Sequence, residues 1–268
     1  MRTDVAHLPH RSLRYLSSGE GRAALLLHAF PLSADQWLPQ LARVPPGWRF
    51  VAPDLRGFRG AGPAFEDPGA ADLSIDDYAR DIAALATHLE IESATVCGVS
   101  MGGYVALAFR RLFPSRVRGL VLSNTRAGAD TAEARASRDR MIELVRREGA
   151  AAVAAAMTPR LLGETTRRDR PDLEDAVRRL IVMNAPGSIA AALAALRDRP
   201  DSTGFLPSID VPALVIAGDE DVVTPPAEAD ILHREIAGST LVVLPGVGHL
   251  SNLEDPLAWN SALHQFLK

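Results

Sequence analysis

Short apolar runs alternate with amphipathic stretches along this chain, and the alternation predicts a sheet of buried strands flanked by helices. Four buried strands are expected in the first half, at residues 23–28, 49–53, 94–97 and 117–122. A weaker alternation at 11–17 predicts an early antiparallel strand or hairpin. The clearest helix begins after Ser74, because Ser74 and Asp77 have the spacing of a capping box and apolar residues follow at intervals of three and four. A helix is also expected at 33–42, and a loop rich in glycine and proline at 55–73.

The alternation breaks between about residues 125 and 207, and this interval divides the chain. It is rich in alanine and arginine, and helices are expected at 134–147, 150–157, 172–183 and 188–198. Beyond it, strands at 211–217 and 240–244 alternate with helices at 225–237 and 255–267. This order favours an α/β fold with a mostly parallel, doubly wound sheet. We expect residues 1–124 and 208–268 to form the α/β core, and residues 125–207 to form a helical lid (cap) inserted after the sixth strand.

One predicted turn between a strand and a helix carries a serine. The hexapeptide Gly98-Val99-Ser100-Met101-Gly102-Gly103 follows the strand at 94–97 and precedes a helical stretch at 104–113. A Gly-x-Ser-x-Gly pattern in this context is typical of a nucleophile elbow, which exposes the serine hydroxyl at the edge of a sheet. The glycines leave room for a strained turn, and the Met101 N–H at the helix N-terminus would face an oxyanion. Ser100 is therefore the candidate nucleophile.

A serine hydroxyl needs a base, and the base needs a partner that orients it. The carboxyl ends of the strands in such a sheet are where catalytic groups collect. Asp219, Glu220 and Asp221 follow the strand at 211–217, and His249 follows the strand at 240–244 in a glycine-rich turn. His249 is the candidate base, and all three acids are candidates for its partner. Asn124 ends an earlier strand, but an amide does not stabilise an imidazolium as a carboxylate does.

An oxyanion hole needs a second N–H besides that of Met101. The segment His28-Ala29-Phe30-Pro31 follows the strand at 23–28, where this donor arises in sheets of this kind. Phe30 N–H is the expected donor, because proline has no N–H to give. The Phe30 side chain either packs in the core or lines the acyl pocket.

Composition narrows the function classes. The chain has 268 residues, 47% of them hydrophobic, and a net charge of −4. No basic stripe interleaved with aromatic residues is present, so a nucleic-acid partner is not expected. The single cysteine, Cys97, lies in a predicted buried strand and excludes an intrachain disulfide. With no apolar stretch of membrane-spanning length and no signal-like N-terminus, we expect a cytoplasmic protein without a membrane partner. Histidines and acids show no metal-ligand spacing, so neither a metal nor a cofactor is expected.

These motifs resemble those of the α/β-hydrolase superfamily, in the right order and along nearly the whole chain. They are His28-Ala29-Phe30-Pro31, Pro53-Asp54-Leu55-Arg56-Gly57-Phe58, the Ser100 hexapeptide, Gly218-Asp219-Glu220-Asp221 and Gly246-Val247-Gly248-His249. Within the superfamily the chain is similar to the esterases and lactonases related to 3-oxoadipate enol-lactonase. The resemblance implies that Asp221, followed by a Thr-Pro pair, is the acid, with Asp219 as the alternative. It also implies structural roles for Asp54 and Arg56. Ala29 replaces a glycine of the family pattern.

The expected function is therefore hydrolysis of a small-molecule carboxylic ester through an acyl-enzyme on Ser100. A lactonase acting on an enol-lactone or an N-acyl homoserine lactone would use the same residues and is the alternative. A non-catalytic ligand receptor on this fold is a third, less favoured hypothesis. A serine at the elbow argues against the dehalogenase and epoxide hydrolase activities of relatives that use aspartate there. Apolar side chains in the lid indicate an apolar acyl pocket, for example Leu144, Met157, Leu161, Leu180 and Met183.

Overall fold

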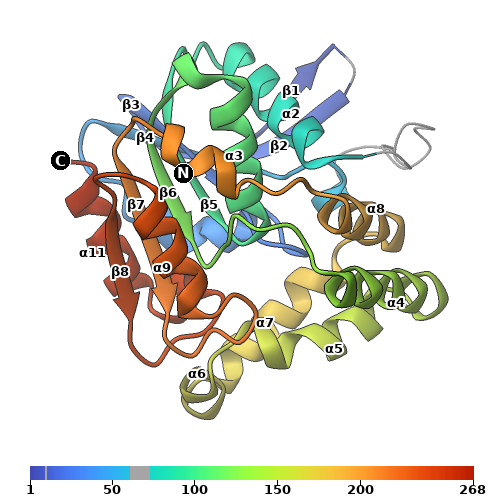
Figure 1. Cartoon of the computed structure of the whole chain (residues 1–268). Helices are drawn as coiled ribbons and strands as arrows, with labels where there is room; N and C mark the ends of the chain where they lie inside the picture. Colours follow the sequence, from blue (N-terminus) through green and yellow to red (C-terminus); the bar gives the residue numbers. More distant parts are fainter. Residues whose placement is uncertain (10, 61–72) are drawn as a thin grey trace.

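An eight-stranded sheet forms the centre of the molecule (Figure 1). The computed structural model describes residues 1–9, 11–60 and 73–268, so His10 and most of the expected loop at 55–73 lie outside the described residues. The strands are β1 (Arg2–Leu8), β2 (Arg11–Gly19), β3 (Arg22–Leu27), β4 (Trp48–Pro53), β5 (Ala94–Val99), β6 (Val117–Ser123), β7 (Ala213–Gly218) and β8 (Thr240–Leu244). Their order is β1-β2-β4-β3-β5-β6-β7-β8. The β1–β2 and β2–β4 pairs are antiparallel and all others are parallel.

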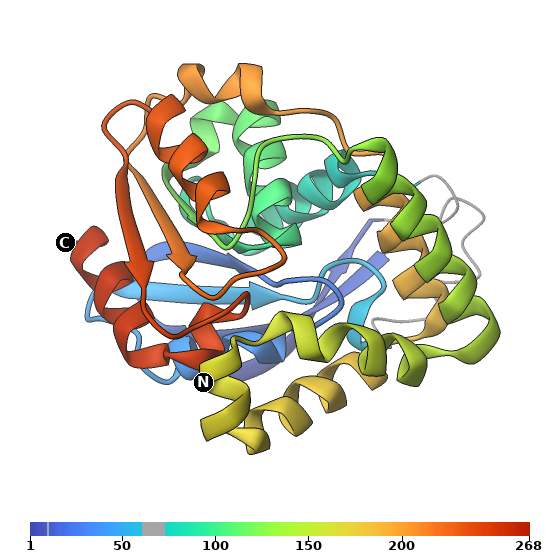
Figure 2. The ribbon, with the colours of Figure 1, turned by 60° about the horizontal axis from the view of Figure 1, so that its bottom comes forward.

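Helices cover both faces of this sheet. Helices α2 (Ile75–His88) and α3 (Met101–Leu112) pack together on one face, and α11 (Pro256–Phe266) lies on the other (Figure 2). The short helices η1 (Ala34–Trp37), α1 (Leu38–Leu41) and α10 (Ser251–Glu254) contact one another and α11. On the α2 and α3 side, η5 (Thr203–Ser208) packs against α9 (Pro226–Glu235). The single-turn helices η2 (Phe58–Gly60) and η4 (Pro114–Arg116) lie in connections. The predicted doubly wound α/β fold is thus confirmed.

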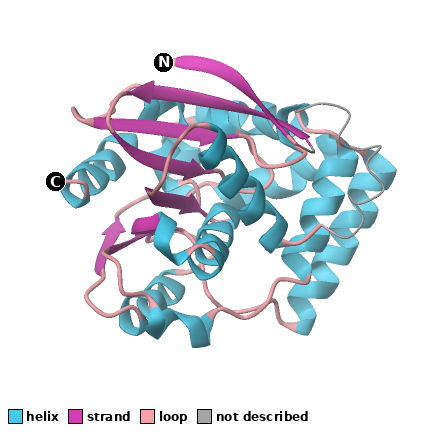
Figure 3. Ribbon diagram, turned by 90° about the horizontal axis from the view of Figure 1, so that it is seen from above, coloured by secondary structure: helices cyan, strands magenta, loops and turns pink. Residues whose placement is uncertain are grey.

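Five α-helices precede η5 in the interval between β6 and β7. They are α4 (Ala132–Glu148), α5 (Ala150–Leu161), α6 (Glu164–Asp169), α7 (Pro171–Val182) and α8 (Pro186–Arg197). Helix α4 packs on α8, and α5 packs on α7. The group lies beyond one end of the strands rather than on a face of the sheet (Figure 3). A helical lid inserted after the sixth strand is therefore confirmed, whereas the boundaries at 124/125 and 207/208 stay a prediction.

The local signals for the first helices agree with the structure. Ser74 caps α2 through a capping box, in which its hydroxyl accepts from Asp77 N–H and the Asp77 carboxylate accepts from Ser74 N–H. Ser33 caps η1 by accepting from Asp35 N–H. In the part of the chain that the structure describes, no single helix is long and apolar enough to cross a membrane. Helices α7 and α8 meet that length and composition only as a pair, bent by 95°.

Candidate active site

Ser100 lies in the sharp turn between β5 and α3. Its backbone has φ 54° and ψ −114°, a region that costs a non-glycine residue about 1–3 kcal/mol and is concentrated at functional sites. The glycines on either side, Gly98 and Gly102, are required because a side chain at either position would not fit. A Cβ on Gly98 would collide with the Gly102 carbonyl, and a Cβ on Gly102 would collide with the Leu27 carbonyl. The hexapeptide therefore folds into the elbow predicted from its sequence.

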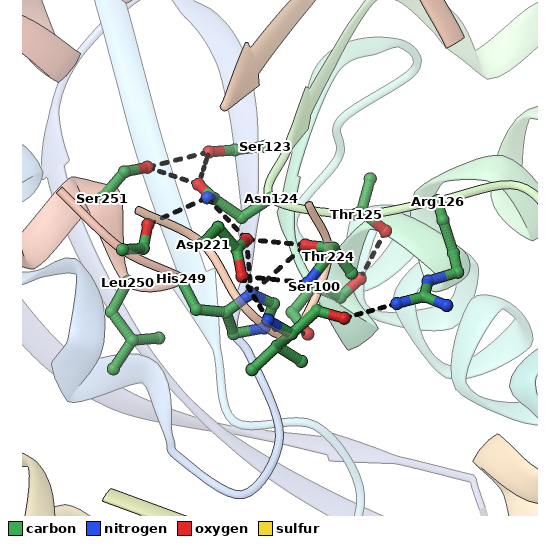
Figure 4. A network of polar contacts seen from close by, with 12 residues as sticks. Ser100, Ser123, Asn124, Thr125, Arg126, Asp221, Thr224, His249, Leu250 and Ser251 are labelled. Carbon is green, nitrogen blue, oxygen red and sulfur yellow. Dashed lines mark hydrogen bonds and ion pairs between the residues drawn. The ribbon is translucent and has the colours of Figure 1, made fainter. Parts of the chain in front are cut away.

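His249 reaches Ser100 from the loop after β8, 149 residues further along the chain (Figure 4). Its Nε2 lies 2.8 Å from Ser100 Oγ, and its Nδ1 lies 2.8 Å from Asp221 Oδ2. Both His249 and Asp221 are buried. Because an ionised carboxylate only accepts, Nδ1 carries the proton and Nε2 is left to accept from the serine hydroxyl. This is the tautomer that a general base for Ser100 needs.

Asp221 is held by five hydrogen bonds. Its Oδ1 accepts from the N–H groups of Val223 and Thr224, at 2.8 and 2.9 Å. Its Oδ2 accepts from Thr224 Oγ1, Asn124 Nδ2 and His249 Nδ1. Burial alone would raise the pKa of Asp221, but His249 and these donors hold that pKa well below its usual range. Asp221 is therefore an anion beside His249 at any working pH.

The two other candidate acids bind elsewhere. Asp219 Oδ1 accepts from the Gly246 N–H at 2.7 Å. Glu220 accepts from the N–H and the hydroxyl of Thr165 in the lid, at 2.8 and 2.5 Å. Of the three acids, the structure brings only Asp221 to His249.

Asn124 supports Asp221, a role that the sequence reasoning missed. The hydroxyls of Ser123 and Ser251 donate to its Oδ1, which turns its Nδ2 toward Asp221 Oδ2 at 3.0 Å and Gly248 O at 3.1 Å. Its backbone has φ 47°, another left-handed residue at the end of a strand. The available signal was a polar side chain at the carboxyl end of β6. An amide at this position acts as a donor to the acid rather than as the acid itself.

The two expected oxyanion donors lie on neighbouring segments. A Cβ on Gly102 would meet the carbonyls of Leu27 and His28, so the first turn of α3 lies directly against the end of β3. Met101 is the first residue of α3, and its N–H has no partner within the helix. Phe30 lines the cavity beside Ser100. Ala29 does not have a positive φ, so replacing the family's glycine introduces no backbone strain there. The donor roles of Phe30 and Met101 stay a prediction.

His28, Asp54 and Arg56 form the frame around this site. Fully buried His28 donates from Nδ1 to Ala29 O at 2.9 Å and accepts at Nε2 from Leu55 N–H at 3.0 Å. Asp54 accepts from the Ala34 N–H and pairs with an arginine on β2. Arg56 forms a two-pronged ion pair with an aspartate on α2. None of these three side chains lines the cavity at Ser100.

A cavity of about 420 Å³ opens onto Ser100 and His249 beneath the lid. Of the five apolar lid residues singled out in the sequence, Met157 and Leu161 line it and the other three do not. The expectation of an apolar pocket is only partly right, because four arginines also belong to the lining: Arg126, Arg138, Arg140 and Arg160. Over residues 1–9, 11–60 and 73–268, no group of three or more histidine, cysteine, aspartate or glutamate side chains could hold a metal ion.

The chain is similar to known hydrolases in sequence and in fold. A family model described as alpha/beta hydrolase fold matches residues 24–256. The chain is 30% identical over 259 residues to 3-oxoadipate enol-lactonase 2 of Acinetobacter baylyi, covering 96% of this chain and 93% of that one. Two solved structures are similar over nearly their full lengths. A thermophilic esterase from Thermogutta terrifontis, with malate bound, has a TM-score of 0.93 and 36% identity, covering 100% of this chain and 98% of the esterase. The enol-lactonase from Burkholderia xenovorans LB400 has a TM-score of 0.89 and 28% identity, covering 98% and 99%.

Proposed function

Because this chain belongs to the α/β-hydrolase family and is a carboxylic-ester hydrolase, we propose that it works through an acyl-enzyme on Ser100. The observation that carries the proposal is the continuous contact from Ser100 Oγ to His249 Nε2 and from His249 Nδ1 to Asp221, at 2.8 Å each. The buried carboxylate orients the imidazole, and the strained elbow presents the hydroxyl to the cavity. These are the roles that acyl transfer to serine requires.

The reaction proceeds in two halves. Ser100 Oγ attacks the ester carbonyl while His249 Nε2 takes the hydroxyl proton, and Asp221 stabilises the imidazolium that results. The N–H groups of Phe30 and Met101 donate to the oxyanion, a contribution worth about 10²–10³ in rate for one such donor. Collapse releases the alcohol with the proton from His249. Water then attacks the Ser100 ester with His249 again as base, and the carboxylic acid leaves.

Hydrolysis of p-nitrophenyl butyrate by the wild type and by Ser100→Ala tests this proposal. We expect steady turnover by the wild type and a loss of at least ~10³-fold in kcat for the variant. Absence of turnover with ligand binding intact would instead favour the receptor hypothesis. An undiminished rate in Ser100→Ala would show that the hydrolysis does not use this serine.

A lactonase acting on an anionic lactone is the second candidate, and the arginines of the cavity favour it. Arg138 is already paired with Asp130, but among the described residues Arg140 and Arg160 have no ion-pair partner. Both are exposed at the cavity, where they can receive a carboxylate on the acyl part of the substrate. The test compares p-nitrophenyl butyrate with mono-p-nitrophenyl glutarate, and a neutral lactone with a carboxylated one. Preference for the charged member, lost in Arg140→Gln/Arg160→Gln, supports this substrate class. Equal kcat/KM for both members contradicts it.

A further inference from the structure

Glu254 is a buried carboxylate that is hydrogen-bonded to the loop carrying His249 on both sides of that residue. Its Oε2 accepts from Gly248 N–H at 2.9 Å, and its Oε1 accepts from Leu250 N–H at 3.0 Å. These are the residues immediately before and after His249. The same Oε2 also accepts from Gly163 N–H in the lid, at 2.8 Å. One side chain therefore joins the lid to both flanks of the candidate base.

The lid and the histidine loop also touch directly at this point. A Cβ on Gly248 would collide with the Gly163 N–H and the Leu162 carbonyl carbon, and a Cβ on Gly163 would lie 2.8 Å from Gly248 N. Leu250 N–H is shared between Glu254 and the carbonyl of Leu161, which it reaches at 3.2 Å. Leu161 itself lines the cavity beside Ser100. The two backbones thus form one junction, consisting of residues 161–163, 248–250 and the Glu254 side chain.

We infer that Glu254 is a positioning residue for the hydrolysis, and that through it the lid segment 161–163 helps to hold His249 against Ser100. This inference rests on the proposed function, since it assigns His249 the role of base. Glu254 does not touch the reacting atoms. It acts by fixing the backbone on either side of the imidazole, so that the ring meets the serine hydroxyl in line.

The chemistry of the junction explains why a carboxylate is needed there. Three N–H groups converge on the Glu254 side chain, and a carboxylate accepts on both oxygens without offering a hydrogen. An amide would offer one acceptor oxygen and would turn an NH₂ group toward at least one N–H. Burial raises the pKa of Glu254, and the converging donors oppose this rise by favouring the ionised form. A shift of the base by about 1 Å can cost about 10²-fold in rate.

The test measures kcat, KM and thermal midpoint for Glu254→Gln and Glu254→Ala on p-nitrophenyl butyrate. We expect kcat to fall by about 10-fold in Glu254→Gln and about 100-fold in Glu254→Ala, with KM changed by less than about two-fold. The rate of Ser100 phosphonylation by a fluorophosphonate should fall in the same order. This second measurement reports how well His249 activates Ser100, and it does not depend on how an ester fits the pocket.

Two control variants separate positioning from stability and from lid attachment. Asp255→Ala removes the carboxylate that caps α11, and Glu220→Gln replaces another carboxylate that ties the lid to the core, through Thr165. Among the described residues neither carboxylate accepts a hydrogen bond from residues 248–250, so both controls should keep kcat near the wild-type value at temperatures where they are folded. The inference is overturned if kcat of the Glu254 variants is unchanged, or if the controls lose as much kcat at an equal drop in thermal midpoint. If the wild type itself neither hydrolyses ester nor reacts with the fluorophosphonate, the proposed function fails instead.

Discussion

His28 is a fully buried histidine whose protonation opposes folding. Burial lowers the pKa of His28 from 6.5 to about 4, because a charged imidazole would lose its hydration there. Between these two values the unfolded chain binds a proton that the folded chain does not, so stability falls as the pH falls from 6.5 toward 4. One proton bound only by the unfolded chain lowers the free energy of unfolding by about 1.36 kcal/mol per pH unit. Over the interval from 6.5 to 4 the loss of stability due to His28 therefore approaches about 3 kcal/mol.

Urea unfolding of the wild type and His28→Gln between pH 7.5 and 4.5 measures this contribution. We expect the variant to be the less stable protein at pH 7.5, since glutamine does not reproduce both hydrogen bonds of the ring. The difference in the free energy of unfolding between the two proteins should shrink as the pH is lowered. At pH 4.5 it should be smaller than at pH 7.5 by about 2 kcal/mol or more. Other titrating groups cancel in the comparison. Parallel pH dependences in the two proteins would contradict a histidine kept neutral by burial.

At the scale of elements, one buried ion pair joins the two chain segments that connect the lid to the core. The chain leaves β6 through residues 125–131 and returns through 198–203, and Asp130 joins Arg199 across this neck at 2.6 Å. Both side chains are only 3% exposed. Arg199 also donates to Gly128 O and stacks on Tyr104, with its guanidinium carbon 4.3 Å from the ring centroid. The pair therefore connects both ends of the lid to a residue of the cavity wall.

Asp130→Ala should destabilise the lid more than the loss of any exposed ion pair in the lid does. Removing one partner of a buried pair leaves an uncompensated charge and costs about 3–5 kcal/mol. Arg197, two residues before Arg199, is half-buried and pairs only with exposed aspartates, so Arg197→Ala should cost less than about 1 kcal/mol. Limited proteolysis of the two variants should show faster cleavage between residues 132 and 197 in Asp130→Ala alone. Equal cleavage would mean that the neck is held by its other contacts.

The helix with the clearest buried stripe was predictable from sequence, whereas two elements that were missed, β1 and α6, each bury a single residue. The helix after Ser74 shows its cap and its apolar spacing in the letters alone, and the structure has it at α2. Strand β1 was missed because it lies at the sheet edge with only Ala6 buried, so no alternation marks it. Helix α6 was missed because its six residues, Glu164–Asp169, bury only Thr166. Local patterns report burial, and these two elements are held by pairing or by neighbouring helices instead.

The candidate site divides in the same way. Ser100 and His249 follow strands in short motifs, so the order of the chain and the topology of the sheet together predict that they meet. Asn124 and Glu254 carry no motif. Their contacts with Asp221 and with the histidine loop exist only because β6, β7 and the segment after β8 end side by side. No spacing along the chain encodes that placement.

At the scale of the whole molecule, Trp259 connects the last helix, α11, to the early helix η1 and to the end of β6 beside the candidate active site. Its ring packs edge-on against Trp37 with centroids 5.4 Å apart, and both residues are fully buried. Its Nε1 donates to Ser123 Oγ at 3.1 Å, and Ser123 in turn donates to Asn124 beside Asp221. The closing helix is thus fastened to η1 by packing and to the end of β6 by one hydrogen bond.

Trp259→Phe should therefore lower global stability while sparing the reaction. Phenylalanine keeps an aromatic ring against Trp37 but loses volume and the N–H, so we expect a cost of about 1–3 kcal/mol by urea unfolding. The Ser123 hydroxyl still donates to Asn124, and Ser251 donates to the same oxygen, so Asp221 keeps its partner. In the folded protein kcat should change by less than about three-fold. Trp48→Phe, on β4 under Arg22, is the matched control for replacing a buried tryptophan. A loss of ten-fold or more in kcat for Trp259→Phe, absent from that control, would mean that the Trp259 N–H is needed to keep Ser123 and Asn124 in place.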